Sequence, residues 1–229
     1  MREQLPSDSG SGRALLTLAV FAIGSTAACE GRLPPIQDPE GIASTAAGQE
    51  SIPIGSLPIL RDDSRGFPAR LAIDSRELQL NGDGLCEWGI FGIDLYRAAL
   101  YTERPCRTLV EAMQPPQIIV IHLDFARSLS KAQLRDAFTA AVRANAKDQA
   151  GEFAPALDAL CAALDAVANG STQTFVCHAS GEIGVHQDGI LRATITDPAF
   201  RDLFVKLYLG DAPPTTALRN GLLGGGRKP

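Results

Sequence analysis

The fold of this chain is decided by two stretches, Leu80-Asn-Gly-Asp-Gly-Leu85 and Leu95-Tyr-Arg-Ala-Ala-Leu-Tyr101. The second lies within residues 90–102, whose alternating character is typical of a long β-strand. Residues 71–81 alternate in part and predict a preceding strand. The glycines between the two strands mark a turn or a bulge, because glycine adopts positive φ angles at little cost. We therefore expect two neighbouring strands connected through this segment.

Further along the chain, the sequence predicts a strand, two helices, a group of strands and two more helices. Residues 117–125 are rich in β-branched side chains and predict a strand. Ser130-Lys-Ala-Gln133 is a capping-box pattern that opens a helix, and a second helix is expected over residues 152–168. The remaining elements are expected as strands over 173–179, 183–187 and 190–196, a helix from Asp197 to about Gly210, and a short helix opened by Pro213-Pro214.

These motifs, taken in order, resemble one known family. The two opening stretches are followed by Gly181-Glu-Ile-Gly-Val-His-Gln-Asp-Gly189 and by Phe200-Arg-Asp-Leu-Phe-Val-Lys-Leu-Tyr-Leu-Gly210. This order and spacing, over residues 66–224, is similar to the chalcone isomerase-like family. The resemblance implies an α+β fold: a long antiparallel sheet with helices packed on one face, plus a small second sheet. The family includes plant enzymes that close a chalcone ring, non-catalytic relatives that bind fatty acids, and secreted bacterial members.

The resemblance also implies where the catalytic residues of the plant enzymes would lie, and this chain departs from them. Their arginine, which binds an anionic group, falls on Cys86, and a threonine in the following strand falls on Tyr96. Their tyrosine and asparagine have no counterpart in residues 129–138, and a polar position in the later helix falls on Arg201. We therefore assign no catalytic residue and no cofactor, since a fold alone does not carry an activity.

The expected function is that of a non-catalytic domain which binds a small apolar or amphipathic ligand, such as a fatty acid. The candidate ligand-binding residues are Tyr96, Arg97 and Tyr101, because a charged group in mid-strand must face either water or an anion. The alternative is a solvent-facing Arg97, with the tyrosines in the core or at its rim. Two other functions stay open: an intramolecular lyase or isomerase that uses Tyr96 with Arg97, and a structural lipoprotein without a ligand.

The three histidines form the other candidate cluster. With a turn centred near residue 182, His178 and His186 face each other across two strands, and His122 is a third imidazole. Zinc sites need further ligands at characteristic spacing, and the chain has no C-x-x-C. We therefore predict a cross-strand polar pair and no metal site.

The N-terminal residues have the layout of a secretory signal peptide. Arg13 precedes the apolar run 14–23, and small residues follow up to Cys29. The run is too short to cross a bilayer as a helix. Thr26-Ala-Ala-Cys29 resembles a bacterial lipobox, in which the cysteine is lipidated, and ordinary cleavage near Ala27 is the alternative. The expected domains are a signal peptide at 1–28, a flexible Pro/Gly-rich tether at 29–65, the chalcone isomerase-like domain at 66–224 and a tail at 225–229.

The composition bounds the partners and the location. The chain has 229 residues, a net charge of -5 and 45% hydrophobic residues, which is typical of a globular domain without general affinity for nucleic acid. A lipidated Cys29 predicts an exported, periplasmic protein anchored to a bacterial membrane. In that oxidising compartment, one or two disulfides are expected among Cys86, Cys106, Cys161 and Cys177. The alternative is that these cysteines are buried free thiols. The oligomeric state is left open.

Overall fold

The computed structural model describes residue 57, residues 66–88 and residues 92–225. The predicted signal peptide, the predicted lipidation site at Cys29 and almost all of the predicted tether lie outside these residues. Leu57, the described residue of the predicted tether, donates its backbone N–H to the carbonyl of Gly189 at 2.8 Å. No helix in the described part of the chain is long and apolar enough to cross a membrane.

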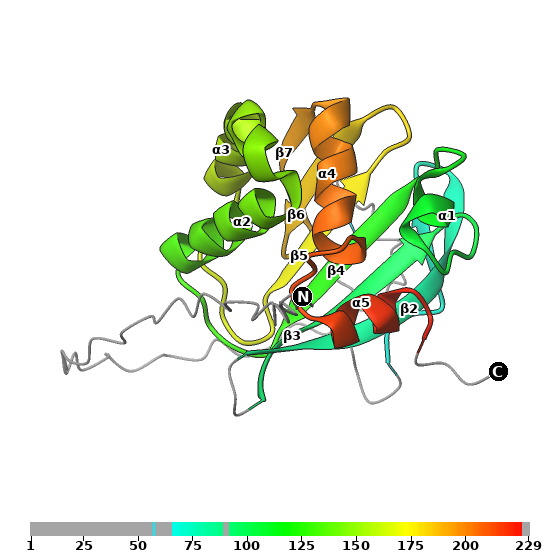
Figure 1. Ribbon diagram of the computed structural model, residues 1–229. Helices are drawn as coiled ribbons and strands as arrows, with labels where there is room; N and C mark the ends of the chain where they lie inside the picture. Colours follow the sequence, from blue (N-terminus) through cyan, green and yellow to red (C-terminus); the bar gives the residue numbers. More distant parts are fainter. Residues whose placement is uncertain (1–56, 58–65, 89–91, 226–229) are drawn as a thin grey trace, which may run out of the picture. The chain divides into compact units, whose positions relative to one another are not determined.

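Seven antiparallel strands form one sheet, in which neighbours in sequence are also neighbours in space (Figure 1). The strands are β1 (Arg70–Ile73), β2 (Arg76–Trp88), β3 (Ile93–Thr102), β4 (Ile119–Phe125), β5 (Thr172–Cys177), β6 (Glu182–Gln187) and β7 (Ile190–Thr196). The predicted α+β fold with an antiparallel sheet is confirmed. The predicted small second sheet is wrong, because β4 pairs with β5 and thereby joins the late strands to the early ones.

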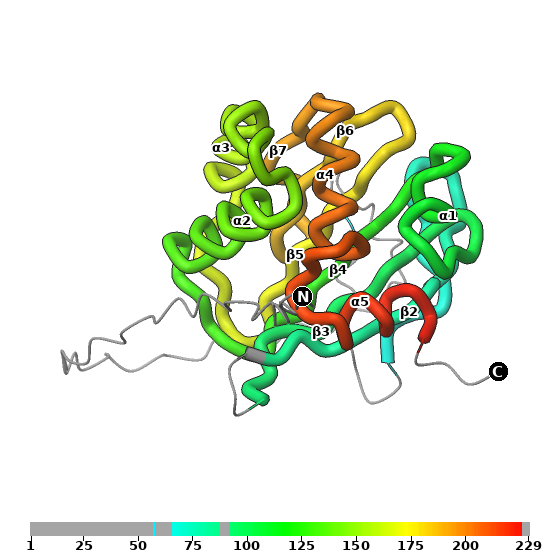
Figure 2. The backbone as a smooth tube through the Cα atoms, in the orientation of Figure 1, coloured from blue at the N-terminus to red at the C-terminus, as the bar shows by residue number. Residues whose placement is uncertain are grey.

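The longer helices lie on one face of this sheet, as predicted (Figures 1 and 2). The helices are α1 (Leu109–Met113), α2 (Lys131–Ala146), the 3-10 helix η1 (Lys147–Phe153), α3 (Ala154–Ala163), α4 (Pro198–Leu209) and α5 (Thr216–Leu222). Helix α2 lies beside α4, and α5 packs against β2. This arrangement leaves a space between α2, α4 and the strands that they cover.

Local capping signals set the helix starts. The Ser130 hydroxyl accepts the N–H of Gln133 at 3.2 Å, and the Gln133 side chain accepts the N–H of Ser130 at 2.9 Å. This is the predicted capping box, which satisfies backbone donors that the first turn leaves free. Helix α4 begins as predicted, with Asp197 accepting the N–H of Phe200 at 2.9 Å and Pro198 at the first helical position.

The helix predicted over residues 152–168 is shorter in the structure. Helix α3 has Pro155 in its first turn and ends at Ala163. Beyond that end, Val167 exchanges two backbone hydrogen bonds of 2.9 Å with Leu129, the residue that leads into α2. Pairing with a distant segment therefore overrides the helical spacing of the last predicted turn.

The segment from Asn81 to Gly84 is a bulged part of β2 and not a turn. The register with β3 shifts between Leu80 and Gly82, and the strand continues beyond the shift. A Cβ atom on Gly82 would lie 2.1 Å from the carbonyl oxygen of Gly221 in α5. The glycine is needed because the backbone of α5 packs directly on the strand at this point.

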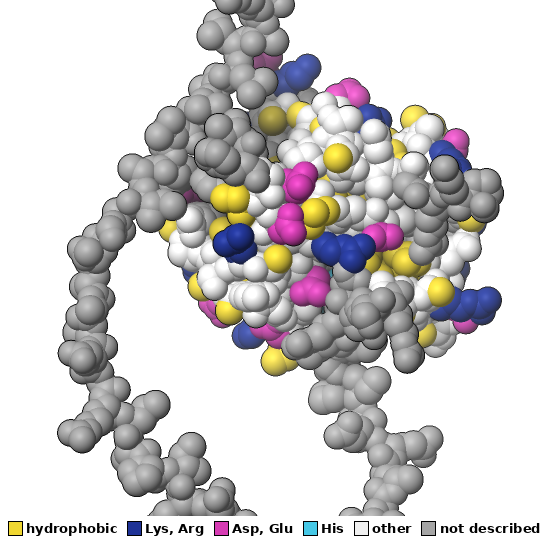
Figure 3. Space-filling view, turned by 90° about the horizontal axis from the view of Figure 1, so that it is seen from below, with side chains coloured by type: hydrophobic (Ala, Val, Ile, Leu, Met, Phe, Trp, Pro, Cys, Tyr) yellow, Lys and Arg dark blue, Asp and Glu magenta, His cyan; other side chains and the backbone are white. Residues whose placement is uncertain are grey.

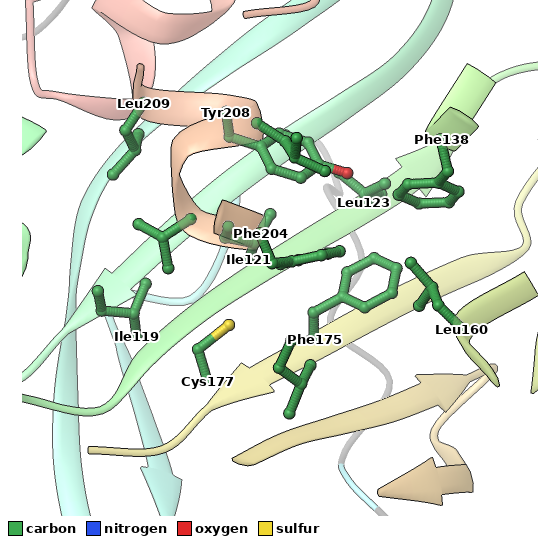
Figure 4. Packing of buried hydrophobic residues seen from close by; sticks show 14 of the residues in the cluster. Ile119, Ile121, Leu123, Phe138, Leu160, Phe175, Cys177, Phe204, Tyr208 and Leu209 are labelled. Atoms are coloured by element: carbon green, nitrogen blue, oxygen red, sulfur yellow. The ribbon is translucent and has the colours of Figure 1, made fainter. Parts of the chain in front are cut away.

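Aromatic side chains fill the core between the sheet and the helices (Figure 4). Phe175 on β5 packs against Phe204 on α4 with their ring centroids 4.7 Å apart, and Phe138 on α2 lies 6.0 Å from Phe175. A second apolar cluster, which includes Phe67 and Tyr101, lies on the other side of β3. The sheet therefore has apolar contacts on both faces.

Candidate ligand-binding site

A pocket of about 540 Å³ opens between the sheet and helices α2 and α4. Its volume lies within the range of sites that bind small molecules. The floor comes from strands β2 to β5, and the walls come from α2, the end of α4 and the loop that follows α4. The lining residues are predominantly apolar, with buried Leu123 and Phe125 on the floor and exposed Pro214 at the rim.

Small side chains on α2 keep the pocket open. Ala137, Ala140, Ala141 and Ala144 line it, together with the larger Leu134 and Phe138 on the same helix. Their spacing of three and four residues places them along one side of the helix. Because alanine has no atoms beyond Cβ, this side of α2 leaves a volume that larger side chains would fill.

Three neutral polar side chains line the pocket near Leu123. Cys86 and Tyr96 are opposite each other on β2 and β3, and their side chains share a hydrogen bond. Tyr208 reaches the same pocket from α4, and Figure 4 shows it close to Leu123 and Phe138. Burial raises the pKa of Tyr96, of Tyr208 and of the Cys86 thiol, because each would have to ionise away from water. All three groups are therefore neutral at physiological pH.

Gln173 on β5 is the most unusual polar group in the pocket. Its side chain is fully buried, and neither amide atom has a hydrogen-bond partner among the described residues. Gln187, directly opposite on β6, is also buried but fully paired. It accepts the N–H of Asp165 at 2.9 Å and donates to the carbonyl of Ala166 at 3.2 Å. Since buried polar groups are normally paired, Gln173 has unused hydrogen-bonding capacity beside the pocket, where neighbouring atoms cover its amide.

The three ligand-binding candidates from the sequence are divided between the two faces of the sheet. Tyr96 lines the pocket. Arg97 lies on the opposite face, where it pairs with Asp83 at 2.6 Å and lies 5.6 Å from the ring centroid of Phe67. Tyr101 is buried in the second cluster, with Phe67. The alternation of side chains along β3 separates Tyr96 from the other two.

The histidines do not form the expected cross-strand pair. The turn between β5 and β6 places His178 opposite Glu182, and His186 lies opposite Thr174 instead. Thr174 also contacts His122, whose Nδ1 lies 2.8 Å from the threonine hydroxyl. The predicted facing of His178 and His186 is therefore wrong, since the turn lies earlier than residue 182. The described part of the chain holds no group of His, Cys, Asp and Glu side chains suited to a metal ion.

The predicted disulfides are not present, and the alternative of buried free thiols holds for all four described cysteines, Cys86, Cys106, Cys161 and Cys177. Three of them lie on β2, α3 and β5 and Cys106 lies in the loop after β3, and all four pack as small apolar side chains. Burial raises the pKa of Cys106 to about 11 and that of Cys177 to about 12. Such thiols stay protonated and are poor nucleophiles at neutral pH.

Cys86 and Arg201, which the family resemblance also pointed to, lie at different places in the fold. Cys86 lines the pocket beside Tyr96. Arg201 is buried near α1, where it donates to the carbonyl of Gln117 at 2.9 Å and pairs with Asp202 at 3.0 Å. Arg201 therefore lies at a separate place from the pocket.

Sequence reasoning missed Gln173, Tyr208 and the alanines of α2. The alanines carry a weak signal, because four of them recur at helical spacing along one side of the helix. Gln173 carries none, since a glutamine in a strand is equally compatible with a solvent-facing position. Its importance depends on partners that only the fold brings near or keeps away.

Comparison with known families agrees with this architecture. A family model described as chalcone isomerase-like matches residues 63–224. The chain belongs to the chalcone isomerase-like family. The resemblance predicted from the motif order is thereby confirmed at the level of the family.

One solved structure extends the comparison. The crystal structure of a fatty-acid binding protein from Arabidopsis thaliana is similar to this chalcone isomerase-like domain, with a TM-score of 0.58. The two are 18% identical, over 72% of this chain and 96% of the other. At that identity the similarity shows a shared fold alone. The chain matches none of the curated protein sequences.

The outer surface differs in character from the pocket. On the face shown in Figure 3, basic and acidic side chains are interspersed. Charges of both signs at short separation largely cancel at a distance. The charges on this face therefore indicate no preference for a ligand of one sign.

Proposed function

We propose that this domain is a non-catalytic binding module which holds a small apolar or amphipathic ligand, such as a fatty acid, in the pocket beneath α2 and α4. The observation that carries this proposal is a pocket of about 540 Å³ whose apolar walls end at a buried, unpartnered glutamine, Gln173. Apolar walls with a few placed polar groups are the usual make-up of a ligand site. The fatty-acid binding protein that shares the fold supports the same ligand class.

The two alternatives have less support. An isomerase that uses Tyr96 together with Arg97 would need both side chains at one site, and they lie on opposite faces of β3. Tyr96 and Cys86 are both protonated at neutral pH, so neither of them accepts a proton from a substrate there. A structural lipoprotein without a ligand would have no use for a pocket that alanines keep open.

The location remains part of the proposal. A signal peptide at 1–28, lipidation of Cys29 and a tether at 29–65 would place the domain in the periplasm, held near a membrane that supplies apolar ligands. In bacteria fed an alkyne-labelled fatty acid, the full-length chain should incorporate label, and Cys29→Ser should abolish the incorporation. Equal labelling of both proteins would contradict lipidation at this residue.

Ligand binding can be tested by filling the pocket. Ala141→Trp places an indole among the lining side chains, whereas Ala159→Trp places the same group on an exposed site of α3 outside the pocket. The full-length chain, freed of lipid, is incubated with decanoic acid, decan-1-ol and decanamide and analysed by native mass spectrometry. We expect Ala141→Trp to lose about tenfold in affinity and Ala159→Trp to match the wild type.

The matched pair also controls for binding outside the pocket. Ligand held by the apolar N-terminal run would be retained equally by both variants and the wild type, and that result would contradict the proposal. Circular dichroism of each variant verifies that the fold is kept before the affinities are compared.

A further inference from the structure

We infer that the pocket selects neutral amphiphiles, with a hydroxyl or carboxamide head group, over carboxylate anions. This inference rests on the proposed ligand-binding function and narrows it. The apolar walls accept a chain of either class, while the polar groups on the floor decide the charge of the head group.

The formal charges around the pocket disfavour an anion. Glu87, exposed at the rim, is the one formally charged side chain among the described lining residues, and no described lysine, arginine or histidine lines the pocket. Arg97 is on the far face, paired with Asp83, and Arg201 is buried near α1, where it pairs with the exposed Asp202. A carboxylate that leaves water needs a cation or several N–H donors to offset its lost hydration. Glu87 would repel it as well.

The hydrogen-bonding capacity of Gln173 fits a neutral head group. Its amide offers two N–H donors and one carbonyl acceptor, and both of its polar atoms are unpartnered. A hydroxyl or a carboxamide donates and accepts, so it can satisfy both atoms. A carboxylate only accepts, so it would leave the carbonyl oxygen of Gln173 buried without a donor.

The two tyrosines that line the pocket point to the same preference. Tyr208 offers a neutral hydroxyl that both donates and accepts, and the Tyr96 hydroxyl, which is hydrogen-bonded to Cys86, can still accept a hydrogen bond. Burial raises the pKa of both phenols, because their surroundings penalise a negative charge. The same surroundings act on the head group of a ligand, which makes an ionised carboxylate the least favourable occupant.

The test compares ligands that differ only in the head group. At pH 8, a fluorescent apolar probe is bound to the full-length wild type and displaced in turn by decan-1-ol, decanamide, decanoic acid and decane. The same titrations on Ala141→Trp measure any binding outside the pocket. We expect the alcohol and the amide to bind about tenfold more tightly than the acid. In Gln173→Met, which keeps the length of the side chain, decanamide should weaken by about tenfold while decane binds as in the wild type.

Each outcome bears on one of the two proposals. If decanoic acid binds the wild type as tightly as decanamide, the neutral preference is wrong and the ligand-binding function stands. If no compound loses affinity in Ala141→Trp, the ligand-binding function itself fails. If Gln173→Met binds decanamide like the wild type, Gln173 does not select the head group. The comparison of ligands on the wild type stays decisive even if the Gln173 variant does not fold.

Discussion

We predict opposite changes in the free energy of unfolding when Gln173 and Gln187 lose their amides. The two residues are of the same type, face each other across β5 and β6 and are both buried. The perturbation is a change of each to methionine, which keeps the side-chain length and removes the amide. Gln173→Met removes two polar atoms without partners, whereas Gln187→Met removes two atoms that are paired with the backbone. We expect the first variant to be more stable than the wild type and the second to be less stable.

The magnitudes follow from the state of each amide. Burying an unpaired amide costs about 1–3 kcal/mol in proteins, so its removal at Gln173 should raise the free energy of unfolding by about that amount. At Gln187 the change breaks two hydrogen bonds, to Asp165 and Ala166. Both of these residues are exposed, so water can replace part of the loss, and we expect a destabilisation of about 1–2 kcal/mol.

Urea unfolding of the ligand-free, full-length chain measures both changes. With a slope of about 2 kcal/mol per M, the two midpoints should fall on opposite sides of the wild type and differ by about 1–2.5 M. A Gln173→Met midpoint below that of the wild type, as low as the Gln187→Met midpoint, would refute the reasoning. That result would mean that the Gln173 amide stabilises the fold and does not serve to bind a ligand. Gain of stability with loss of binding is the pattern expected of a functional residue.

Three further predictions address the fold, the face of β3 and the thiols. Gly82→Ala forces a Cβ to within 2.1 Å of the Gly221 carbonyl oxygen and should lower the free energy of unfolding by about 3 kcal/mol in urea titrations. In the control Gly151→Ala, the new Cβ meets no atom within 4 Å, and the free energy of unfolding should change by less than about 1 kcal/mol. Arg97→Ala should leave ligand affinity within about twofold of the wild type, because Arg97 lies on the face away from the pocket; a tenfold loss in the competition assay would contradict this placement. Burial raises the pKa of Cys106 from 9.0 to about 11 and that of Cys177 to about 12. The unfolded chain therefore loses these protons first, so the free energy of unfolding is unaffected below pH 9 and falls as the pH rises towards those values. Urea midpoints that stay level from pH 8 to 11 would contradict this prediction.

Much of the fold could be predicted because its signals are local. The capping box of Ser130 and Gln133 and the cap of Asp197 act over three residues, so the sequence pattern contains both partners of each hydrogen bond. The alternation over β3 likewise separates Tyr96 from Arg97 without knowledge of what lies on either face.

Other features were inaccessible because their causes lie far away in the chain. The glycines of β2 resemble a turn signal, but the reason for Gly82 is the backbone of α5, which arrives from the end of the domain. The helix predicted to reach residue 168 stops at Ala163, because Val167 pairs with Leu129. In each case a distant partner overrides a valid local preference.

By itself, the sequence determined the membership of the chalcone isomerase-like family through the order of motifs, and that resemblance implied the antiparallel α+β architecture. Strand alternation and helix caps located single elements within it. Only the tertiary structure decided which side chains share the pocket. Tyr96 meets Tyr208 and Gln173 there because β3, α4 and β5 converge, while Arg97 is turned away. The physical reason is that hydrogen-bond satisfaction and burial depend on every neighbouring element. A glutamine can therefore be recognised as unpartnered only when all of its surroundings are in place.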